Sequence, residues 1–368
     1  MPHVVVAPDK FKGSLTASAA AAAVARGIDR VRPGLTVHQV PVADGGDGTV
    51  DAALAAGYAK LTADVHGPTG RPVTATIAVR DEVAVVEVAS ACGLTLLPDG
   101  VFAPLTASSY GVGELLLAAA DAGCRAVVLG LGGSASTDGG AGIVQALGGS
   151  VVDAAGESLP PGGGALRRVA GVDLSTIDPR LSTMEFVLAT DVDNPLLGPV
   201  GAAPMFGPQK GADPAQVAEL TAGLRAWSDV LAPALRDEPG AGAAGGIGFA
   251  ALAVLHASCR SGIDLLLDLV GFADHLPGAA LVITGEGSLD EQSLHGKAPI
   301  GVVRAARAAG VPSVAVAGRC ALDAGALADA GIDACYALAD LEPDPAASMA
   351  NAGPLLEQLA ARLAEDLL

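Results

Sequence analysis

The chain has 368 residues, and its 21 basic and 40 acidic side chains give a formal net charge of −19. This balance argues against a basic stripe for nucleic acid and against a cationic face for anionic lipid. Hydrophobic residues make up 51% of the chain, which excludes a disordered protein. At roughly 100–200 residues per domain, the length predicts two or three domains.

The N-terminal segment begins an alternation of apolar strands and Ala-rich helices, which is typical of parallel βαβ units. We predict a strand at 3–7, a helix near 15–31 and a second strand at 36–42. Ser14 and Thr16 are candidate caps for this helix, because hydroxyl side chains accept hydrogen bonds from the first backbone N–H groups.

The middle of the chain has a different pattern, because its first three apolar runs are short and spaced like an antiparallel meander. Strands and helices in mixed order follow, so this segment predicts a mixed α/β domain. The predicted strands are 60–65, 73–78, 83–88, 125–131 and 185–189, and the predicted helices lie near 110–122, 139–147, 214–234 and 247–258.

The end of the chain returns to the first alternation. The predicted strands are 280–284, 313–317 and 333–337, and the predicted helices are 299–309, 324–330 and 354–367. Two strands from the start and three from the end would form one doubly wound parallel sheet. We therefore expect a flavodoxin-like domain of strand order 2-1-3-4-5 from residues 1–58 and 277–368. An inserted mixed α/β domain at 59–276 and a cleft between the two domains complete this expectation, with the ligand crevice at the ends of strands 1 and 3.

No targeting or membrane segment is indicated. Residues 1–10 lack the basic and apolar regions of a secretion signal. The longest uncharged stretch, 239–259, has five glycines in its first half, which favours a glycine loop and a buried helix over a membrane span. The five cysteines form neither a CxxC pair nor a cluster with histidine, so no disulfide framework or zinc site is indicated. We expect a cytoplasmic protein without a membrane or nucleic-acid partner.

Two lysines follow the first predicted strand in the segment Ala7-Pro8-Asp9-Lys10-Phe11-Lys12. With a helix N-terminus behind them, Lys10 and Lys12 would form a positive pocket for an anion. The alternative is an ordinary loop that carries two solvated lysines.

Acidic and glycine residues follow the second strand. Asp44 and Asp47 lie on a turn with three glycines, where carboxylates can hold Mg²⁺ or accept a hydroxyl proton. A plain turn is the alternative. Asp191 similarly follows the strand at 185–189, where it is a candidate base or metal ligand or only caps a turn.

A glycine-rich loop, 130–140, joins a predicted strand to a helix. Gly132, Gly133 and Ser134 could cradle phosphate with backbone N–H groups and a hydroxyl, although the loop fits neither the Walker A nor the GxGxxG pattern. The alternative is a simple connecting loop. Lys210, on a tight turn, is a candidate contact for phosphate or carboxylate.

The third strand of the predicted sheet ends in another acidic, glycine-rich segment. Glu286 and Asp290 would face the crevice there. The pair Gly296-Lys297 precedes the next helix, where an anion could dock. Turn residues without a ligand are the alternative in both cases.

Seven motifs cover nearly the whole chain, at 7–17, 43–49, 130–142, 190–196, 207–212, 240–248 and 283–301. In this order they resemble the type I glycerate kinase family, bacterial enzymes that phosphorylate D-glycerate with ATP. Departures include Lys10, where the family often has Ser, and Thr190, where it often has Cys. None of these departures replaces an acidic or glycine residue on which the motifs depend.

The resemblance implies a two-domain kinase that uses Mg²⁺ and ATP to phosphorylate D-glycerate, and we expect the phosphoryl transfer to be direct and in-line. It implies 2-phosphoglycerate or 3-phosphoglycerate as the product, of which we favour the first, and we expect a monomer or homodimer. We expect Asp191 as the base, Asp44 and Lys10 as further catalytic residues, and metal ligands at Asp44, Asp47 and Asp191. The expected substrate- and phosphate-binding residues are Lys12, Lys210, Gly132, Gly133, Ser134, Glu286 and Asp290.

Two other classes of function fit parts of this pattern. A nicotinamide-dependent dehydrogenase is compatible with the βαβ start, but the first strand is not followed by GxGxxG. A non-catalytic protein that closes on a small anion is the second alternative. The extracytoplasmic signal that is usual for such proteins is missing.

Overall fold

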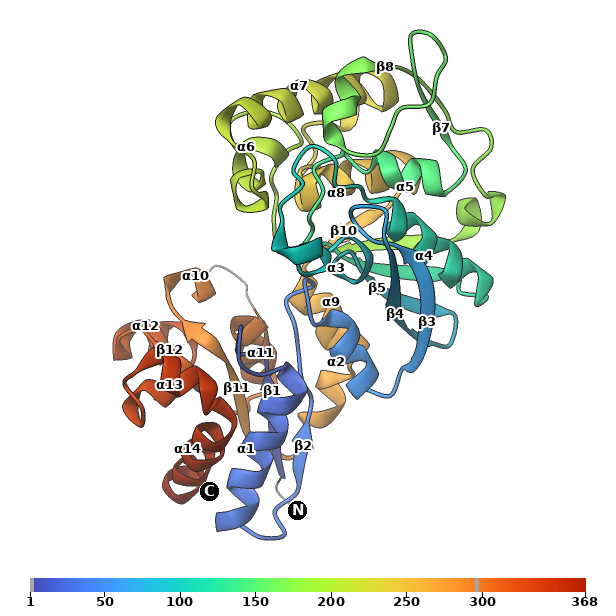
Figure 1. Ribbon diagram of the computed structural model, residues 1–368. Helices are drawn as coiled ribbons and strands as arrows, with labels where there is room; N and C mark the ends of the chain where they lie inside the picture. The colour runs from blue at the N-terminus through green and yellow to red at the C-terminus, as the bar shows by residue number, and fades with distance from the viewer. Residues whose placement is uncertain (1–2, 295–297) are drawn as a thin grey trace. The chain divides into compact units, whose positions relative to one another are not determined.

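The computed structural model describes residues 3–294 and 298–368, and the chain divides into two compact units (Figure 1). The first unit comprises Met1–Asp44, Asp51–Gly57 and Gly262–Leu368, and the second comprises Gly45–Val50 and Tyr58–Ser261. In the described part of the chain, no helix combines the length and apolar character needed to cross a membrane. The predicted anion site at Gly296-Lys297 lies outside the described residues.

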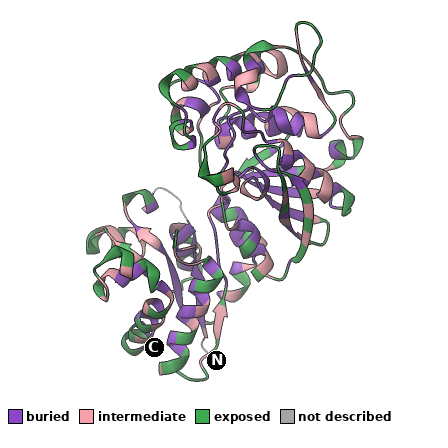
Figure 2. Ribbon diagram, viewed as in Figure 1, coloured by how far each residue is buried: buried purple, intermediate pink, exposed green. Residues whose placement is uncertain are grey.

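The first unit contains a five-stranded parallel sheet of order β2-β1-β11-β12-β13, which confirms the predicted doubly wound sheet of order 2-1-3-4-5. Its central strands are buried on both faces (Figure 2), as is typical of a parallel sheet that helices cover on two sides. The strands are β1 His3–Pro8, β2 Val37–Gln39, β11 Ala279–Leu289, β12 Ser313–Cys320 and β13 Cys335–Ala337.

Helices pack on each face of this sheet. One core cluster joins Val4 and Val6 of β1 to helices α1 and α14, and the other joins Val5 to helices α9 and α11. The helices of this unit are α1 Ala17–Val31, α9 Gly262–Leu269, α10 Glu291–Leu294, α11 Ala298–Ala308, α12 Ala324–Ala330, α13 Pro345–Ala350 and α14 Ala352–Leu367. Helix α2, Thr49–Ala55, has most of its residues in this unit.

The first unit extends further back along the chain than the sequence predicted. Residues 262–276 belong to it, whereas the predicted insertion runs to residue 276. The reason is packing, because Ile263, Leu266 and Phe272 join the core around Val5 of β1. The sequence analysis did not predict helix α9, which carries the first two of these side chains.

Thr16 alone acts as the N-cap of α1. Its Oγ1 accepts a hydrogen bond from the backbone N–H of Ala19 at 3.1 Å, whereas Ser14 Oγ donates to the Phe11 carbonyl at 3.0 Å. Strand β2 is shorter than predicted, but the hydrogen bonds to β1 continue beyond it through Val40 N and Val42 N.

The second unit contains a six-stranded mixed sheet of order β10-β9-β6-β5-β4-β3. The predicted meander is present as the antiparallel strands β3, β4 and β5, and the remaining strands pair in parallel. Strand β10 and the hairpin β7–β8 were not predicted. The strands are β3 Ala59–His66, β4 Pro72–Arg80, β5 Val83–Glu87, β6 Ala126–Gly130, β7 Ser150–Asp153, β8 Val169–Asp173, β9 Glu185–Ala189 and β10 Ser258–Arg260.

The helices of the second unit pack around this sheet and beside the hairpin. They are α3 Ala89–Cys92, α4 Tyr110–Asp121, α5 Ala141–Ala146, α6 Ala202–Phe206, α7 Pro214–Leu231 and α8 Ala243–Val254. Helix α8 begins and ends earlier than the predicted 247–258. Three successive left-handed residues, Ala244, Gly245 and Gly246, form an irregular first turn, and His256 has a positive φ of 51° beyond its end.

The contact between α1 and α14 depends on a glycine. A Cβ at Gly27 would lie 2.2 Å from the Glu357 backbone oxygen, so Gly27→Ala should force the two helices apart. We expect a loss of about 1–3 kcal/mol in the free energy of unfolding, measured by urea denaturation. The matched control is Gly353→Ala, where the nearest atom is at an ordinary 3.8 Å, and unchanged stability in both variants would contradict the prediction.

Candidate active site

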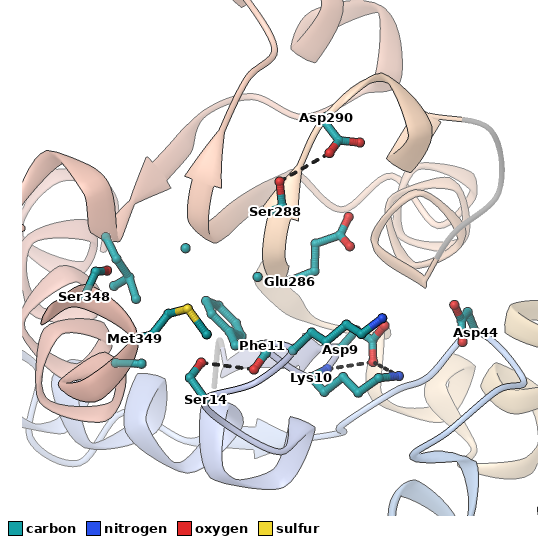
Figure 3. A pocket seen from close by; sticks show the side chains of 15 residues that line it. Asp9, Lys10, Phe11, Ser14, Asp44, Glu286, Ser288, Asp290, Ser348 and Met349 are labelled. Carbon is teal, nitrogen blue, oxygen red and sulfur yellow. Dashed lines mark hydrogen bonds and ion pairs between the residues drawn. The ribbon is translucent and has the colours of Figure 1, made fainter. Parts of the chain in front are cut away.

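A pocket of about 480 Å³ lies in the first unit, at the end of β1 and along β11 (Figure 3). It brings together five of the site residues predicted from the sequence, together with Asp9 and apolar side chains such as Met349. The five predicted residues are Lys10, Lys12, Asp44, Glu286 and Asp290.

The pairing of β1 with β11 creates the pocket. Asp9 N donates to the Gly285 carbonyl at 2.8 Å, and Thr284 Oγ1 donates to the Ala7 carbonyl at 2.8 Å. Both strands are parallel, so the segments that follow them emerge at the same edge of the sheet, where doubly wound folds bind ligands. Glycine is required at position 285, because a Cβ there would lie 2.0 Å from the Val316 carbonyl oxygen.

Asp9 is a pocket residue that the sequence analysis did not select. It is only 7% exposed, its Oδ1 accepts a hydrogen bond from Lys10 N at 2.6 Å, and Lys10 Nζ lies 3.9 Å from the same oxygen. The pKa of Asp9 is raised to about 7, mainly by burial and to a smaller extent by the charges of Asp44 and Glu286, while Lys10 opposes the shift. The sequence contains one indication of its role, because Asp9 is an acidic residue directly after a buried strand. The two neighbouring lysines were selected in its place.

The acids on the β11 side differ in their surroundings. Asp290 accepts a hydrogen bond from Gln292 N on Oδ1 and from Ser288 Oγ on Oδ2, so it fixes the turn before α10. Glu286 is buried, and Lys12, which also lines the pocket, is exposed. The pocket thus combines ammonium groups, which bind anions, with carboxylates, which accept protons and hydrogen bonds from hydroxyl groups.

In the second unit, the glycine-rich loop after β6 packs against the loop that carries Asp47. A Cβ at Gly132 would lie 2.5 Å from Gly46 Cα, and a Cβ at Gly130 would lie 2.7 Å from the Gly45 oxygen. Gly132 is therefore required for the contact between the loops. Gly133, next to it, is exposed and has a φ of +71°.

Lys210 supports the same loop from inside the protein. It is 2% exposed, and its Nζ donates to Ser134 Oγ at 2.7 Å and to the Ser136 carbonyl at 2.5 Å. Burial lowers the pKa of Lys210 to about 8, although Cys92 and Asp138 oppose this shift. The structure thus places Lys210 behind the loop, where its ammonium group orients Ser134.

Asp138 is a second organising residue that the sequence analysis missed. It is fully buried, and its Oδ2 accepts hydrogen bonds from Ser109 N, Ser109 Oγ and Gly142 N at 2.8, 2.9 and 3.3 Å. Its Oδ1 accepts from Gly140 N at 3.2 Å. These bonds fix the start of α5 and the end of the glycine-rich loop.

The three predicted metal ligands are distributed over both units. Asp44 is half-buried in the first unit, and Asp47 and Asp191 are exposed in the second. Among residues 3–294 and 298–368, no group of three or more His, Cys, Asp or Glu side chains is placed to hold a metal ion. The donor chemistry nevertheless fits Mg²⁺, which phosphoryl-transfer sites hold through one or two carboxylates together with phosphate oxygens. The roles of these three residues remain predictions.

A doubly wound sheet with a charged pocket at its strand ends is the architecture of α/β proteins that take small ligands. The sequence profile of the glycerate kinase family matches residues 4–368. The chain is 44% identical to a Bacillus subtilis glycerate kinase over 342 residues, which cover 91% of this chain and 90% of that protein. It is 43% identical to the Escherichia coli K12 glycerate 2-kinase, with the same coverage of both chains.

A solved structure agrees with these relatives. The crystal structure of a Salmonella typhimurium LT2 protein assigned as glycerate kinase 2 superposes with a TM-score of 0.85 at 38% identity. The match covers 100% of this chain and 98% of that one. The chain therefore belongs to the glycerate kinase family, which confirms the resemblance drawn from its seven motifs. It is an enzyme, a kinase, and the dehydrogenase and non-catalytic alternatives are set aside.

If Lys210 acts by supporting the loop, Lys210→Met should lower stability by about 1–3 kcal/mol, because Ser134 Oγ and the Ser136 carbonyl lose their buried donor. The difference in stability between the parent and the variant should grow from pH 8 to pH 10. Between the lowered folded pKa of about 8 and the ordinary value of 10.5, only the unfolded chain holds the proton, so parent stability rises with pH there. Thermal unfolding of the parent and of Lys210→Met between pH 8 and pH 10 measures this difference in stability. A variant of parental stability that has lost activity would instead indicate a direct phosphate contact.

Asp191→Asn tests the prediction that Asp191 is the base. If Asp191 is the base, turnover should fall at least about a hundredfold, the lower end of what general-base catalysis contributes. The thermal unfolding temperature should stay unchanged, because the residue is exposed. The matched control is Asp193→Asn, two positions along the same exposed loop. Near-parental turnover of Asp191→Asn would remove Asp191 from the catalytic residues.

Proposed function

We propose that this enzyme transfers the γ-phosphoryl group of Mg-ATP to a hydroxyl of D-glycerate and that the product is 2-phosphoglycerate. Membership of the glycerate kinase family supports the acceptor, and the Escherichia coli relative named glycerate 2-kinase supports the position of transfer. The observation that carries the proposal is the pocket at the ends of β1 and β11, where Lys10 and Lys12 lie beside carboxylates.

In-line phosphoryl transfer asks a protein mainly for positioning and for neutralisation of charge. Lys10 and Lys12 are suited to neutralise the carboxylate or phosphate groups of the substrates, and Glu286 and Asp290 can accept hydrogen bonds from hydroxyl groups. Gly133 has the exposed backbone that a phosphate can approach, next to Gly132 and Ser134. The bond from Lys210 holds the Ser134 hydroxyl in a fixed orientation.

We propose Asp44, Asp47 and Asp191 as the ligands of Mg²⁺, with Asp44 also serving catalysis. The metal, when bound, neutralises charge on the phosphate oxygens and orients them. Glycines on both sides of Asp47 give its loop the positive φ values of 83° at Gly45 and 102° at Gly48. These conformations let backbone and ligand approach closely.

We further propose that the enzyme acts in the cytoplasm as a monomer or homodimer, and that its two compact units are its two domains. No nucleic-acid or membrane partner is part of this proposal, in keeping with the net charge of −19.

A coupled ADP-release assay with Mg-ATP and D-glycerate tests the function, and phosphorus NMR of the product assigns the position. We expect ADP release that depends on D-glycerate and a product phosphorylated at position 2. Reactions without an acceptor measure background ATP hydrolysis and serve as the control. A product phosphorylated at position 3 would correct the position only, whereas ADP release that is independent of D-glycerate would contradict the proposed acceptor.

A further inference from the structure

Asp9 occupies the position in the first unit where a doubly wound sheet presents its ligand-binding edge. It directly follows β1, and its backbone is fixed to β11 by the hydrogen bond from Asp9 N to the Gly285 carbonyl. Figure 3 shows Asp9 beside Lys10, with Asp44 and Glu286 around the same pocket. The side chain is therefore held by a rigid element at the edge of an open space, as a reacting group must be.

The bonding of Asp9 differs from that of the other deeply buried aspartate. Asp138 receives four hydrogen bonds, which use both of its oxygens to organise a loop and a helix start. From the described part of the chain, the carboxylate of Asp9 receives one, from Lys10 N to Oδ1. Within residues 3–294 and 298–368, Asp9 is thus oriented by a hydrogen bond to Oδ1 alone.

A structural role accounts poorly for Asp9. It does not cap α1, because Thr16 does so seven residues later. Its ion pair with Lys10 is long, at 3.9 Å, and a pair without close, well-aligned contacts contributes little stabilising energy. Burying a carboxylate with so few partners costs stability, and proteins retain such groups mainly at functional sites.

The charges around Asp9 suit a group that both accepts and releases a proton. Lys10 on its own loop favours the carboxylate, whereas Asp44 from the loop after β2 and Glu286 from β11 oppose it. Lys12 lines the same pocket. Burial is the largest effect, and the resulting pKa is about 7. Near neutral pH the carboxylate is present and is basic enough to take a proton.

We propose that Asp9 is the catalytic base, the group that removes the proton from the acceptor hydroxyl in this pocket. The proposal rests on the proposed function. The hydroxyl oxygen forms a bond to the γ-phosphorus of ATP, the bond from that phosphorus to the bridging oxygen breaks, and its electron pair leaves with ADP. The hydroxyl proton passes to Asp9 and then to water. Under this assignment the base is Asp9 and not Asp191, and Asp191 keeps its proposed role as a ligand of Mg²⁺.

Asp9→Asn in the full-length enzyme is the direct test, because asparagine preserves the shape and the hydrogen bond from Lys10 N but cannot take the proton. We expect kcat to fall about a hundredfold or more while KM for D-glycerate and for ATP changes less than about threefold. In the parent, kcat/KM for D-glycerate should rise with pH through about 7 and then level off, and the variant should lose this rise. Asp29→Asn, exposed on α1, is the matched control and should match the parent.

Comparison with Asp191→Asn separates the two candidate bases. That variant should keep the rise in activity near pH 7 and require more Mg²⁺ for half-maximal turnover. If Asp191→Asn loses the rise and Asp9→Asn keeps it, Asp191 is the base and our proposal is overturned. Retention of more than about a tenth of parental kcat by Asp9→Asn would also overturn it.

Thermal unfolding provides a readout that does not depend on activity. The pKa of Asp9 in the folded protein lies above the ordinary 3.8, so the folded state binds this proton more tightly than the unfolded state. The protonation of Asp9 therefore contributes its full stabilisation below pH 3.8, and this stabilisation is lost as pH rises through 7. Asp9→Asn should therefore raise the unfolding temperature at pH 8 and raise it less at pH 5. A lowered unfolding temperature at pH 8 would show that Asp9 is a structural partner and would overturn the proposal.

Failure of the proposed function gives a different result. A parent enzyme that releases no ADP in the presence of D-glycerate contradicts the function, and the role of Asp9 falls with it. A parent that is active with D-glycerate, accompanied by an equally active Asp9→Asn variant, overturns the role of Asp9 alone.

Discussion

The parallel pairing of β1 with β11 is the contact on which the first unit depends. It joins His3–Pro8 to Ala279–Leu289 and places two segments from opposite ends of the sequence at one edge of the sheet. The charged groups of Asp9, Lys10 and Glu286 share a pocket only because these strands are neighbours. The two hydrophobic clusters on the faces of the sheet hold the pairing in register by burying Val4, Val5 and Val6 completely.

The two units use buried charge in opposite ways. In the second unit, Lys210 donates to a hydroxyl group and a backbone carbonyl of the glycine-rich loop. Asp138, near the end of that loop, accepts from Ser109 and from Gly140 N, so both charged groups maintain the conformation of the loop. In the first unit, the carboxylate of the buried Asp9 accepts one hydrogen bond from the described residues, and its pKa is raised to about 7. A well-bonded charge stabilises a fold, whereas a poorly bonded one keeps chemical reactivity at the expense of stability.

Much of this architecture could be predicted from the sequence. Alternating apolar segments predicted the strand order of the first unit, because a parallel sheet buries continuous β-branched runs such as Val4–Val6. Helix α9 was missed because its run of leucines lacks a clear boundary, and β10 was missed because three residues carry little pattern. The five predicted residues that line the pocket of the first unit were selected because they are charged and follow strands. Asp9 was missed because its burial depends on β11, about 270 positions away, which local patterns do not report.

The discontinuous first unit has a consequence for how the chain folds during synthesis. After β1 leaves the ribosome, the 270 residues between Pro8 and Ala279 must be made before its partner β11 exists. At about 5–20 residues per second this takes roughly 15–55 s. Helix α1 and strand β2 follow β1 at once and can shelter one face and one edge of it, but the edge that later receives β11 stays without a partner. The second unit, whose residues all precede Gly262, can meanwhile complete its own sheet. Nascent chains of this enzyme thus carry an open strand edge of the kind that chaperones protect.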